Sequence, residues 1–509
     1  MIGFFIIPKR RHIMKEITYS STRGADECLT ASQAILNGLA SDGGLYVPDH
    51  IPVLETGLQN LARMDYRHVA FEVMRLFLTD YTDDELRRCI DAAYDDKFDT
   101  EEIAPLAEAA DAFFLELYHG ATIAFKDMAL SILPHLMTTA AAKNHVDSEI
   151  VILTATSGDT GKAALAGFAS VPGTRIIVFY PKDGVSPIQK QQMITQQGDN
   201  THVVGINGNF DNAQTGVKKL FADQELRKWM EERGMRFSSA NSINIGRLIP
   251  QIVYYVYAYT RLLKEERITE GAPINVVVPT GNFGNILAAY YAGQMGIPIA
   301  KLICASNENK VLYDFFSSGT YDRNREFILT SSPSMDILIS SNLERLIYHI
   351  SGNDATKCRT LMELLARTGR YDISDDMKAK LEPFAGGYCD EAQTLNTIKS
   401  IYESCGYLID THTAVAAGVY RSYREKSGDK TPAVIASTAS PYKFTGSVLR
   451  AIDPEYSSDD DFDKADRLYE LSKVPIPKAV SEIRTAPILH RTICEVDEME
   501  QAVKDFLSR

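Results

Sequence analysis

Short apolar segments that alternate with amphipathic ones are the feature that most constrains the fold of this chain. Each apolar segment is four or five residues long. That length suits a strand buried on both faces, and the amphipathic stretches between the segments suit helices. The sequence therefore predicts parallel α/β sheets covered by helices on both faces. The expected strands are residues 113–117, 150–153, 175–179, 202–206, 274–278 and 433–437.

Helical periodicity marks further segments, and together with shifts in composition it predicts a domain organisation. Helices are expected over residues 31–39, 67–78, 248–262 and 286–295, and others are expected to begin near Lys126 and Thr160. The apolar run at the N-terminus is too short for a signal peptide, and its charges follow the run. The expected units are a disordered arm (1–13), an N-terminal domain (14–100), a large domain (101–145 and 241–455) with a helical insertion (310–400), a small α/β domain (146–240) and a charged tail (456–509).

Composition excludes several classes of function. The 509 residues include 53 basic and 67 acidic side chains, for a net charge of −14, which disfavours nucleic-acid binding. No apolar run reaches the roughly 20 residues of a membrane span, so no membrane partner is expected. The seven cysteines are scattered without CxxC spacing, which predicts a reducing, cytoplasmic location and no metal site. The oligomeric state stays open, with a monomer as the working expectation.

Lys126 stands out in the first turn that follows an expected strand. Small and apolar residues precede it, and a lysine in such surroundings loses hydration, so its pKa falls. A lysine of this kind can form a Schiff base with an aldehyde. The alternative is a lysine whose amine reaches solvent from the start of a helix.

Two further turns collect groups that bind anions. Residues 154–162 place hydroxyls and backbone amides at a helix start, but Thr156 and Ala163 do not fit a Walker A loop. A plain N-cap by Asp159 or Thr160 is the alternative there. Residues 279–285 contain two glycines that let backbone amides approach a phosphate, without the GxGxxG spacing of a dinucleotide site.

Two polar clusters could supply groups to the same crevice. Residues 241–247 offer amides, a hydroxyl and the Arg247 guanidinium, which suits a planar anion. The alternative there is an Asx-type cap followed by a solvated arginine. Residues 436–444 add Thr438 and Lys443 after a late strand. A desolvated lysine, a phosphate-binding turn and a second anion site on one α/β framework indicate a pyridoxal-phosphate enzyme.

Several strings in the chain resemble the threonine synthase family. They include residues 19–24, 42–48, 119–127, 157–161, 241–247 and 410–416. The resemblance covers most of the chain and points to the longer, bacterial and fungal-type branch. It implies a fold-type II, tryptophan synthase β-like architecture with two parallel-sheet domains and an N-terminal domain. It further implies pyridoxal 5'-phosphate as cofactor and O-phospho-L-homoserine as small-molecule substrate.

The resemblance also implies roles for individual residues. Lys126 would be the catalytic Schiff-base lysine and would carry protons, Thr438 would bind the pyridine nitrogen, and Asp159 would lie near the phenolic oxygen. The implied cofactor-binding residues are Lys126, Phe125, Asp159, Gly281, Asn282, Phe283, Gly284, Asn285 and Thr438. The implied substrate-binding residues are Ser157, Thr160, Asn241, Ser242, Arg247 and Lys443.

The reaction implied is conversion of O-phospho-L-homoserine and water to L-threonine and phosphate. One departure from the family pattern is that Ser440 and Tyr442 stand where the family usually has histidine and alanine. Two alternatives remain: a phospho-lyase that releases 2-oxobutyrate and ammonia from the same substrate, and a catalytically silent binding protein with the same fold. The lysine and the phosphate-binding turn argue against the silent protein.

Overall fold

Two open sheets form the framework of the protein. The computed structural model describes residues 16–156, 158–183, 185 and 187–509. The larger sheet has the strand order β13 (Phe384–Tyr388), β10 (Ile299–Ser306), β9 (Ile274–Pro279), β14 (Ala433–Ser437), β4 (Ala112–Glu116), β3 (Leu106–Ala109). The smaller sheet has the order β15 (Thr492–Cys494), β7 (Thr201–Ile206), β6 (Thr174–Pro181), β5 (Glu149–Ala155), β8 (Met235–Ser238).

All six strands expected from the sequence are present, with ends that differ by no more than a few residues. Every pairing in the two sheets is parallel except that of β3 with β4, which is antiparallel. The strands at the centre of each sheet are buried along their length, as the continuous apolar runs predict. The prediction of two parallel sheets is thus confirmed, with one antiparallel edge strand added.

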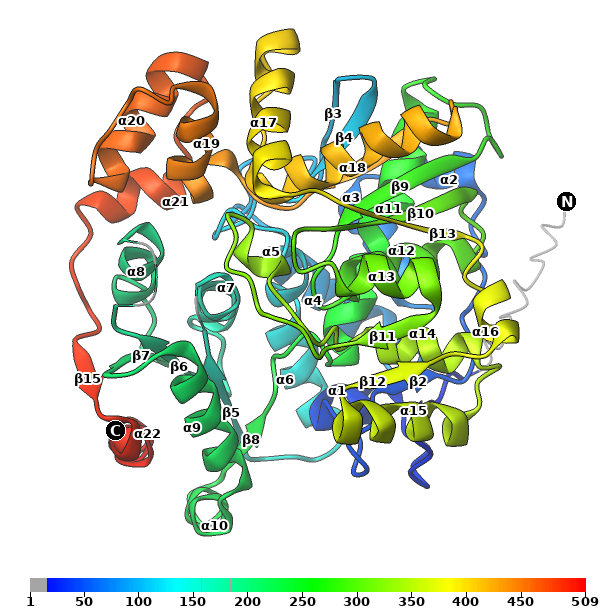
Figure 1. Cartoon of the computed structure of the whole chain (residues 1–509). Helices are drawn as coiled ribbons and strands as arrows, with labels where there is room; N and C mark the ends of the chain where they lie inside the picture. The colour runs from blue at the N-terminus through cyan, green and yellow to red at the C-terminus, as the bar shows by residue number, and fades with distance from the viewer. Residues whose placement is uncertain (1–15, 157, 184, 186) are drawn as a thin grey trace, which may run out of the picture.

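Helices cover both sheets, and the longest of them lies between the large sheet and the N-terminal region (Figure 1). This helix, α11 (Ile245–Lys264), is buried along almost all of its length and packs against α3 (Tyr66–Met74) and α12 (Gly284–Gln294). The other helices before residue 300 are α1 (Ala31–Asn37), α2 (Leu58–Leu61), α4 (Asp83–Ala93), α5 (Asp127–Leu130), α6 (Leu133–Lys143), α7 (Asp159–Phe168), α8 (Pro187–Ile194), α9 (Phe210–Ala222) and α10 (Gln224–Glu231). The N-terminal region also contains a small antiparallel pair, β1 (Tyr19–Ser21) with β2 (Tyr46–Pro48).

Residues 310–400 are less of an independent helical insertion than the sequence suggests. Strand β13 lies within this range and pairs with β10, so part of the range belongs to the large sheet. A two-stranded sheet, β11 (Thr320–Asp322) with β12 (Arg370–Asp372), also lies there. The helices of the range are α13 (Val311–Ser318), η1 (Pro333–Met335), α14 (Leu343–Ile350), α15 (Ala355–Thr368), α16 (Asp375–Ala379) and α17 (Glu391–Cys405).

The C-terminal residues form structure instead of a charged tail. Strand β15 extends the small sheet beside β7, and α22 (Met499–Leu507) buries apolar side chains against that sheet. Residues 456–509 are rich in polar side chains because only one face of each of their helices is covered. Their composition alone therefore suggested an unstructured tail. The remaining helices are α18 (Thr411–Ser427), η2 (Pro441–Phe444), α19 (Thr445–Ile452), α20 (Asp461–Ser472), α21 (Lys478–Ser481), η3 (Glu482–Arg484) and η4 (Val496–Glu498).

Within the described ranges, no helix combines the length and the apolar character needed to cross a membrane.

A partly buried histidine joins the N-terminal region to the large sheet. The ring nitrogens of His119 lie 2.6 Å from Asp99 Oδ1 and 3.0 Å from Glu116 Oε2. Burial opposes a charge on this ring, but the two carboxylates outweigh it and raise the pKa of His119 to about 9. The pKa of His119 is thus higher in the folded protein than in the unfolded chain. Protonated His119 therefore stabilises the fold fully below about pH 6.5, and this stabilisation is lost as the pH rises through the folded-state pKa.

We expect His119→Gln to lower the free energy of unfolding by about 1–2 kcal/mol near pH 6. The pKa shift alone would suggest a larger loss, but Asp99 is partly exposed and solvent screens its charge. The difference from the wild type should vanish above about pH 10, where the wild-type ring is neutral. Urea unfolding at both pH values measures this. His68→Gln is the matched control, since the ring of His68 is 63% exposed beside Asp65. An equal loss at both pH values for His119→Gln would contradict the electrostatic explanation.

Candidate active site

The site lies where the carboxyl ends of strands from both sheets face each other. Lys126 follows β4 and immediately precedes α5, and Thr438 follows β14, the neighbour of β4 in the sheet. The two loops are joined, since Phe125 N donates to Thr438 O at 2.8 Å and Ser440 N donates to Ile123 O at 3.1 Å. Adjacent parallel strands end at the same edge, so residues distant in sequence meet there.

The Lys126 amine lies inside this site and does not reach out to solvent. Its Nζ is 3.3 Å from Ser334 Oγ and 3.5 Å from Asp159 Oδ2, and the side chain is 12% exposed. Burial lowers the pKa of Lys126, and the nearby charges of Lys443 and Arg247 lower it further, whereas Asp159 opposes the shift. A lysine with a lowered pKa is neutral, and so nucleophilic, over a wider pH range than an ordinary lysine.

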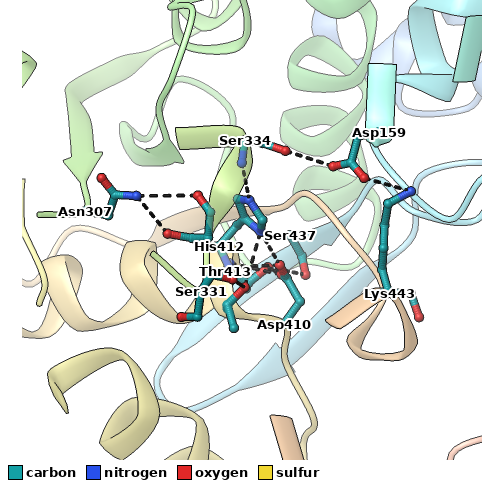
Figure 2. A network of polar contacts seen from close by, with 12 residues as sticks. Asp159, Asn307, Ser331, Ser334, Asp410, His412, Thr413, Ser437 and Lys443 are labelled. Atoms are coloured by element: carbon teal, nitrogen blue, oxygen red, sulfur yellow. Dashed lines mark hydrogen bonds and ion pairs between the residues drawn. The ribbon is translucent and has the colours of Figure 1, made fainter. Parts of the chain in front are cut away.

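Asp159 enters the site from the small sheet, as the first residue of α7 after β5. Its carboxylate lies 3.2 Å from Lys443 Nζ and accepts hydrogen bonds from Ser334 Oγ (2.8 Å) and Gln189 Nε2 (3.0 Å) (Figure 2). Burial would raise the pKa of Asp159, but Lys443 and Lys126 hold it well below the usual range of a carboxyl. Asp159 therefore stays ionised between the two lysines.

Neither Asp159 nor Thr160 caps the helix that they begin. The Thr156 hydroxyl accepts instead from the backbone amides of Gly158 (2.9 Å) and Gly161 (3.0 Å). This leaves the Asp159 carboxylate free to face the lysines, and the capping interpretation of the turn is wrong. Thr160 is partly buried in the first turn of α7, and Ser157 lies outside the described residues.

Arg247 is buried in the first turn of α11, contrary to the alternative of a solvated arginine. It is 3% exposed, and its Nη1 donates to Ala240 O at 3.1 Å. Burial lowers its pKa to about 10, with Tyr254 opposing the shift. Among the described residues nothing accepts a hydrogen bond from its buried Nε. Such a guanidinium has spare donors for an anion.

The other polar members of residues 241–247 differ in burial. Asn244 caps α11 through the amide of Gly246 at 2.9 Å, so the Asx-type cap that the sequence allows is present. Asn241 is exposed and Ser242 is partly buried. These two residues lie at the outer side of the cluster, with Arg247 inside it.

Residues 281–285 form a turn between β9 and the N-terminus of α12 that suits a phosphate. A Cβ added to Gly281 would lie 2.4 Å from Ser334 O, so the close approach of these loops requires glycine. Phe283 adopts the left-handed conformation with φ of 64°. Below the turn, Asn285 Oδ1 accepts from the Tyr254 hydroxyl at 2.8 Å and from the Tyr255 hydroxyl.

The Asn285 amide has its oxygen toward those two hydroxyls. Because both are bonded to Oδ1, the Nδ2 donor faces the other way, and within the described part of the chain this buried group has no partner. An unpartnered donor beside the first turn of an eleven-residue helix is a favourable setting for phosphate. The residues present therefore fit the phosphate group of pyridoxal 5'-phosphate.

Next to Lys126 and Asp159 lies a group of residues to which the sequence analysis gave no site role. Figure 2 shows Ser334, Asp410 and His412 of this group. Ser334 Oγ lies between these two side chains, and its backbone N donates to His412 Nε2 at 3.2 Å. The His412 proton therefore lies on Nδ1, which faces Asp410 Oδ2 at 2.8 Å. The sequence signal for Asp410 and His412 was their position at a helix start after an apolar run. Ser334 lies in a loop and carried no signal.

The departure at Tyr442 has a structural explanation. Its ring is fully buried, and its hydroxyl donates to Val474 O. Tyr442 thereby anchors the segment that leads to the C-terminal elements. Lys443, the next residue, points the opposite way and donates to Thr122 O at 2.8 Å besides pairing with Asp159.

Comparisons with known proteins agree with this geometry. The family model "Threonine synthase N terminus" matches residues 18–94, "Pyridoxal-phosphate dependent enzyme" matches 101–439, and "Threonine synthase, C-terminal" matches 413–506. The chain is 40% identical to Threonine synthase-like 1 of Pongo abelii over 465 residues, which cover 87% of this chain. The match spans only 62% of the length of that relative.

Two other relatives match over most of their own length. Threonine synthase of Pseudomonas aeruginosa is 38% identical over 441 residues, covering 85% of this chain and 90% of the relative. The crystal structure of PLP-bound threonine synthase from Brucella melitensis superimposes with a TM-score of 0.86 at 34% identity, over 96% of this chain and 99% of that one. The chain belongs to the threonine synthase family of fold-type II, pyridoxal-phosphate-dependent enzymes.

Proposed function

We propose that this enzyme converts O-phospho-L-homoserine and water to L-threonine and phosphate. The observation that carries the proposal is the pairing of Lys126 and Lys443 with a single carboxylate, Asp159, beside a separate phosphate-binding turn. The charge of buried Arg247 also acts on Lys126 and lowers its pKa. The turn accommodates the phosphate of the cofactor, and the remaining positive charge suits a substrate that carries a phosphate and a carboxylate of its own.

The cofactor supplies an electron sink for negative charge that develops on the substrate carbon chain. The chain's own residues do the rest of the work. Lys126 would hold the cofactor covalently, and its amine, when free, would move protons at the α and β carbons of the substrate. In the overall balance, phosphate leaves the γ carbon, which becomes a methyl group by gaining the proton that the β carbon loses. Water supplies the hydroxyl group of the β carbon, and its remaining proton ends on phosphate.

The roles proposed for the other residues are those that the family resemblance implies. Thr438 contacts the ring nitrogen of the cofactor, Asp159 lies near its phenolic oxygen, and Phe125 lines its site. Residues 281–285 hold its phosphate. The substrate anions are bound by Ser157, Thr160, Asn241, Ser242, Arg247 and Lys443, of which Arg247 is buried in the first turn of α11. We further propose a cytoplasmic location and a monomeric protein.

A phospho-lyase is the second candidate function, since the relatives named Threonine synthase-like 1 match at 40% identity and the bacterial threonine synthase at 38%. The two reactions share every step up to the loss of phosphate. They differ in whether water then adds to the β carbon, which gives threonine, or hydrolyses the released imine, which gives 2-oxobutyrate and ammonia. Incubation of the purified protein with O-phospho-L-homoserine distinguishes them. Threonine with an equal amount of phosphate supports the synthase, whereas 2-oxobutyrate with ammonia supports the lyase and overturns our assignment.

We expect Arg247→Ala to lower kcat/KM for O-phospho-L-homoserine by about 100-fold, because a buried charge-assisted donor to an anion is lost. Cofactor binding should be retained. Steady-state kinetics and a cofactor titration measure the two effects. Arg261→Ala is the matched control, since Arg261 lies near the other end of the same helix and faces Glu102 and Glu265. Equal kinetics for both variants would show that Arg247 does not bind substrate.

A further inference from the structure

One side chain joins the two loops that are proposed to hold the cofactor phosphate and the substrate anions. Asn342 lies just before α14 and is completely buried. Its Nδ2 donates to Asn282 O and to Ser242 O, both at 3.1 Å. Its backbone N also donates to Asn282 O, at 3.0 Å. Asn282 belongs to the turn after β9, and Ser242 belongs to the segment before α11.

The orientation of the Asn342 amide is fixed by chemistry. Both loop atoms are carbonyl oxygens, which only accept, so the nitrogen must face them. The oxygen faces the Arg345 guanidinium, which only donates. Arg345 is fully buried and also donates to Tyr46 O at 2.9 Å and Ile243 O at 2.6 Å. It thereby holds Asn342 and the segment that contains Ser242 in one position.

A neighbouring residue contacts the cofactor turn alone. Ser340 Oγ donates to Gly281 O at 2.6 Å, and no contact joins its hydroxyl to residues 241–247 within the described structure. Ser340 therefore supports one loop, while Asn342 supports both. Variants of Ser340 and Asn342 can therefore be compared: a change at Ser340 affects support of the cofactor turn alone, whereas a change at Asn342 also affects the link between the two loops.

We propose that Asn342 is a positioning residue that couples the cofactor-phosphate turn to the substrate-anion segment. The inference rests on the proposed function, which assigns those two roles to the loops. A shift of either loop moves the shared amide, so that ordering of one favours the bound geometry of the other. Such coupling is reciprocal: the cofactor increases affinity for the phosphorylated substrate, and the substrate increases affinity for the cofactor by the same factor.

Asn342→Asp is the sharpest test, because it keeps the shape and the Arg345 contact but replaces the donor by an oxygen that repels both carbonyls. We expect the dissociation constant of pyridoxal 5'-phosphate from the apoprotein to rise about tenfold or more, measured by fluorescence titration. At saturating cofactor, the KM for O-phospho-L-homoserine should rise by about tenfold as well.

Asn200→Asp is the matched control. Asn200 also donates through Nδ2 to backbone carbonyls, namely Phe168 O (2.7 Å), Thr174 O (3.1 Å) and Val171 O (3.5 Å), but it lies in the small-sheet region away from both loops. It should leave both constants unchanged. Ser340→Ala should raise the cofactor dissociation constant severalfold and leave KM unchanged at saturating cofactor.

The proposal is overturned if Asn342→Asp leaves both constants unchanged, as Asn200→Asp should. It is also overturned if Asn342→Asp changes only the cofactor dissociation constant or only the KM. If circular dichroism shows that Asn342→Asp is unfolded, Asn342→Ala is judged by the same two constants. Wild-type protein that makes no product from O-phospho-L-homoserine counts against the proposed function alone, because the cofactor titration uses no substrate. The effect of Asn342 on the cofactor constant would then still be measured.

Discussion

Replacement of Lys126 by alanine is expected to abolish covalent attachment of the cofactor and to reduce turnover by at least about 10⁴-fold. The physical reason is that no other amine lies in the same position relative to Asp159 and Ser334 in the described structure. The visible absorbance of the attached cofactor measures attachment. Hydride trapping followed by peptide mass spectrometry identifies the labelled side chain in the wild type.

Lys162→Ala is the control for this experiment. Lys162 is also a buried lysine, and burial lowers its pKa to about 8, but its Nζ donates a hydrogen bond to Gln196 Oε1. Low pKa alone would make both lysines candidates, whereas geometry selects Lys126. A label on Lys162, or unchanged absorbance in Lys126→Ala, would refute the assignment on which the proposed function depends.

Gly281→Ala is expected to weaken cofactor binding by about 10- to 100-fold while the protein stays folded. The added methyl group would lie 2.4 Å from Ser334 O and 3.4 Å from Met335 Cα, so backbone atoms must move. The movement separates the phosphate-binding turn from the loop that presents Ser334 to Lys126. Titration of the apoprotein with pyridoxal 5'-phosphate measures the effect.

Gly293→Ala provides the contrast within the same part of the chain. Gly293 lies in α12, and a Cβ there would meet only Ile299 side-chain atoms at 3.8 Å or more. We expect an unchanged cofactor constant and a gain of about 0.5–1 kcal/mol in the free energy of unfolding, because alanine favours a helix over glycine. Similar cofactor affinities in the two variants would show that the turn does not hold the phosphate.

Local sequence patterns predicted most of the central strands of the two sheets. Helix ends were less exact: a helix is expected over 31–39, but α1 ends at Asn37, where Gly38 with φ of 70° forms the C-cap. Strand β13 was missed, because Phe384–Tyr388 contains two adjacent glycines and reads as a turn. Strand β15 was missed as well, since it is only three residues long and two of these residues are exposed. Edge strands are short and half covered, so the apolar run that identifies a central strand is absent.

The sequence by itself determined the parallel framework and predicted Lys126 and two turns rich in anion-binding groups, because periodicity, glycines and helix starts are local properties. Only the tertiary structure decided that Asp159 from one sheet lies between Lys126 and Lys443 from the other. It also decided that Arg247 is buried and that Ser334 and Asn342 support the site. The burial of a side chain, its pKa and its contacts across loops depend on which distant segments pack together. The pattern of residues within one segment does not show which distant segment will pack against it.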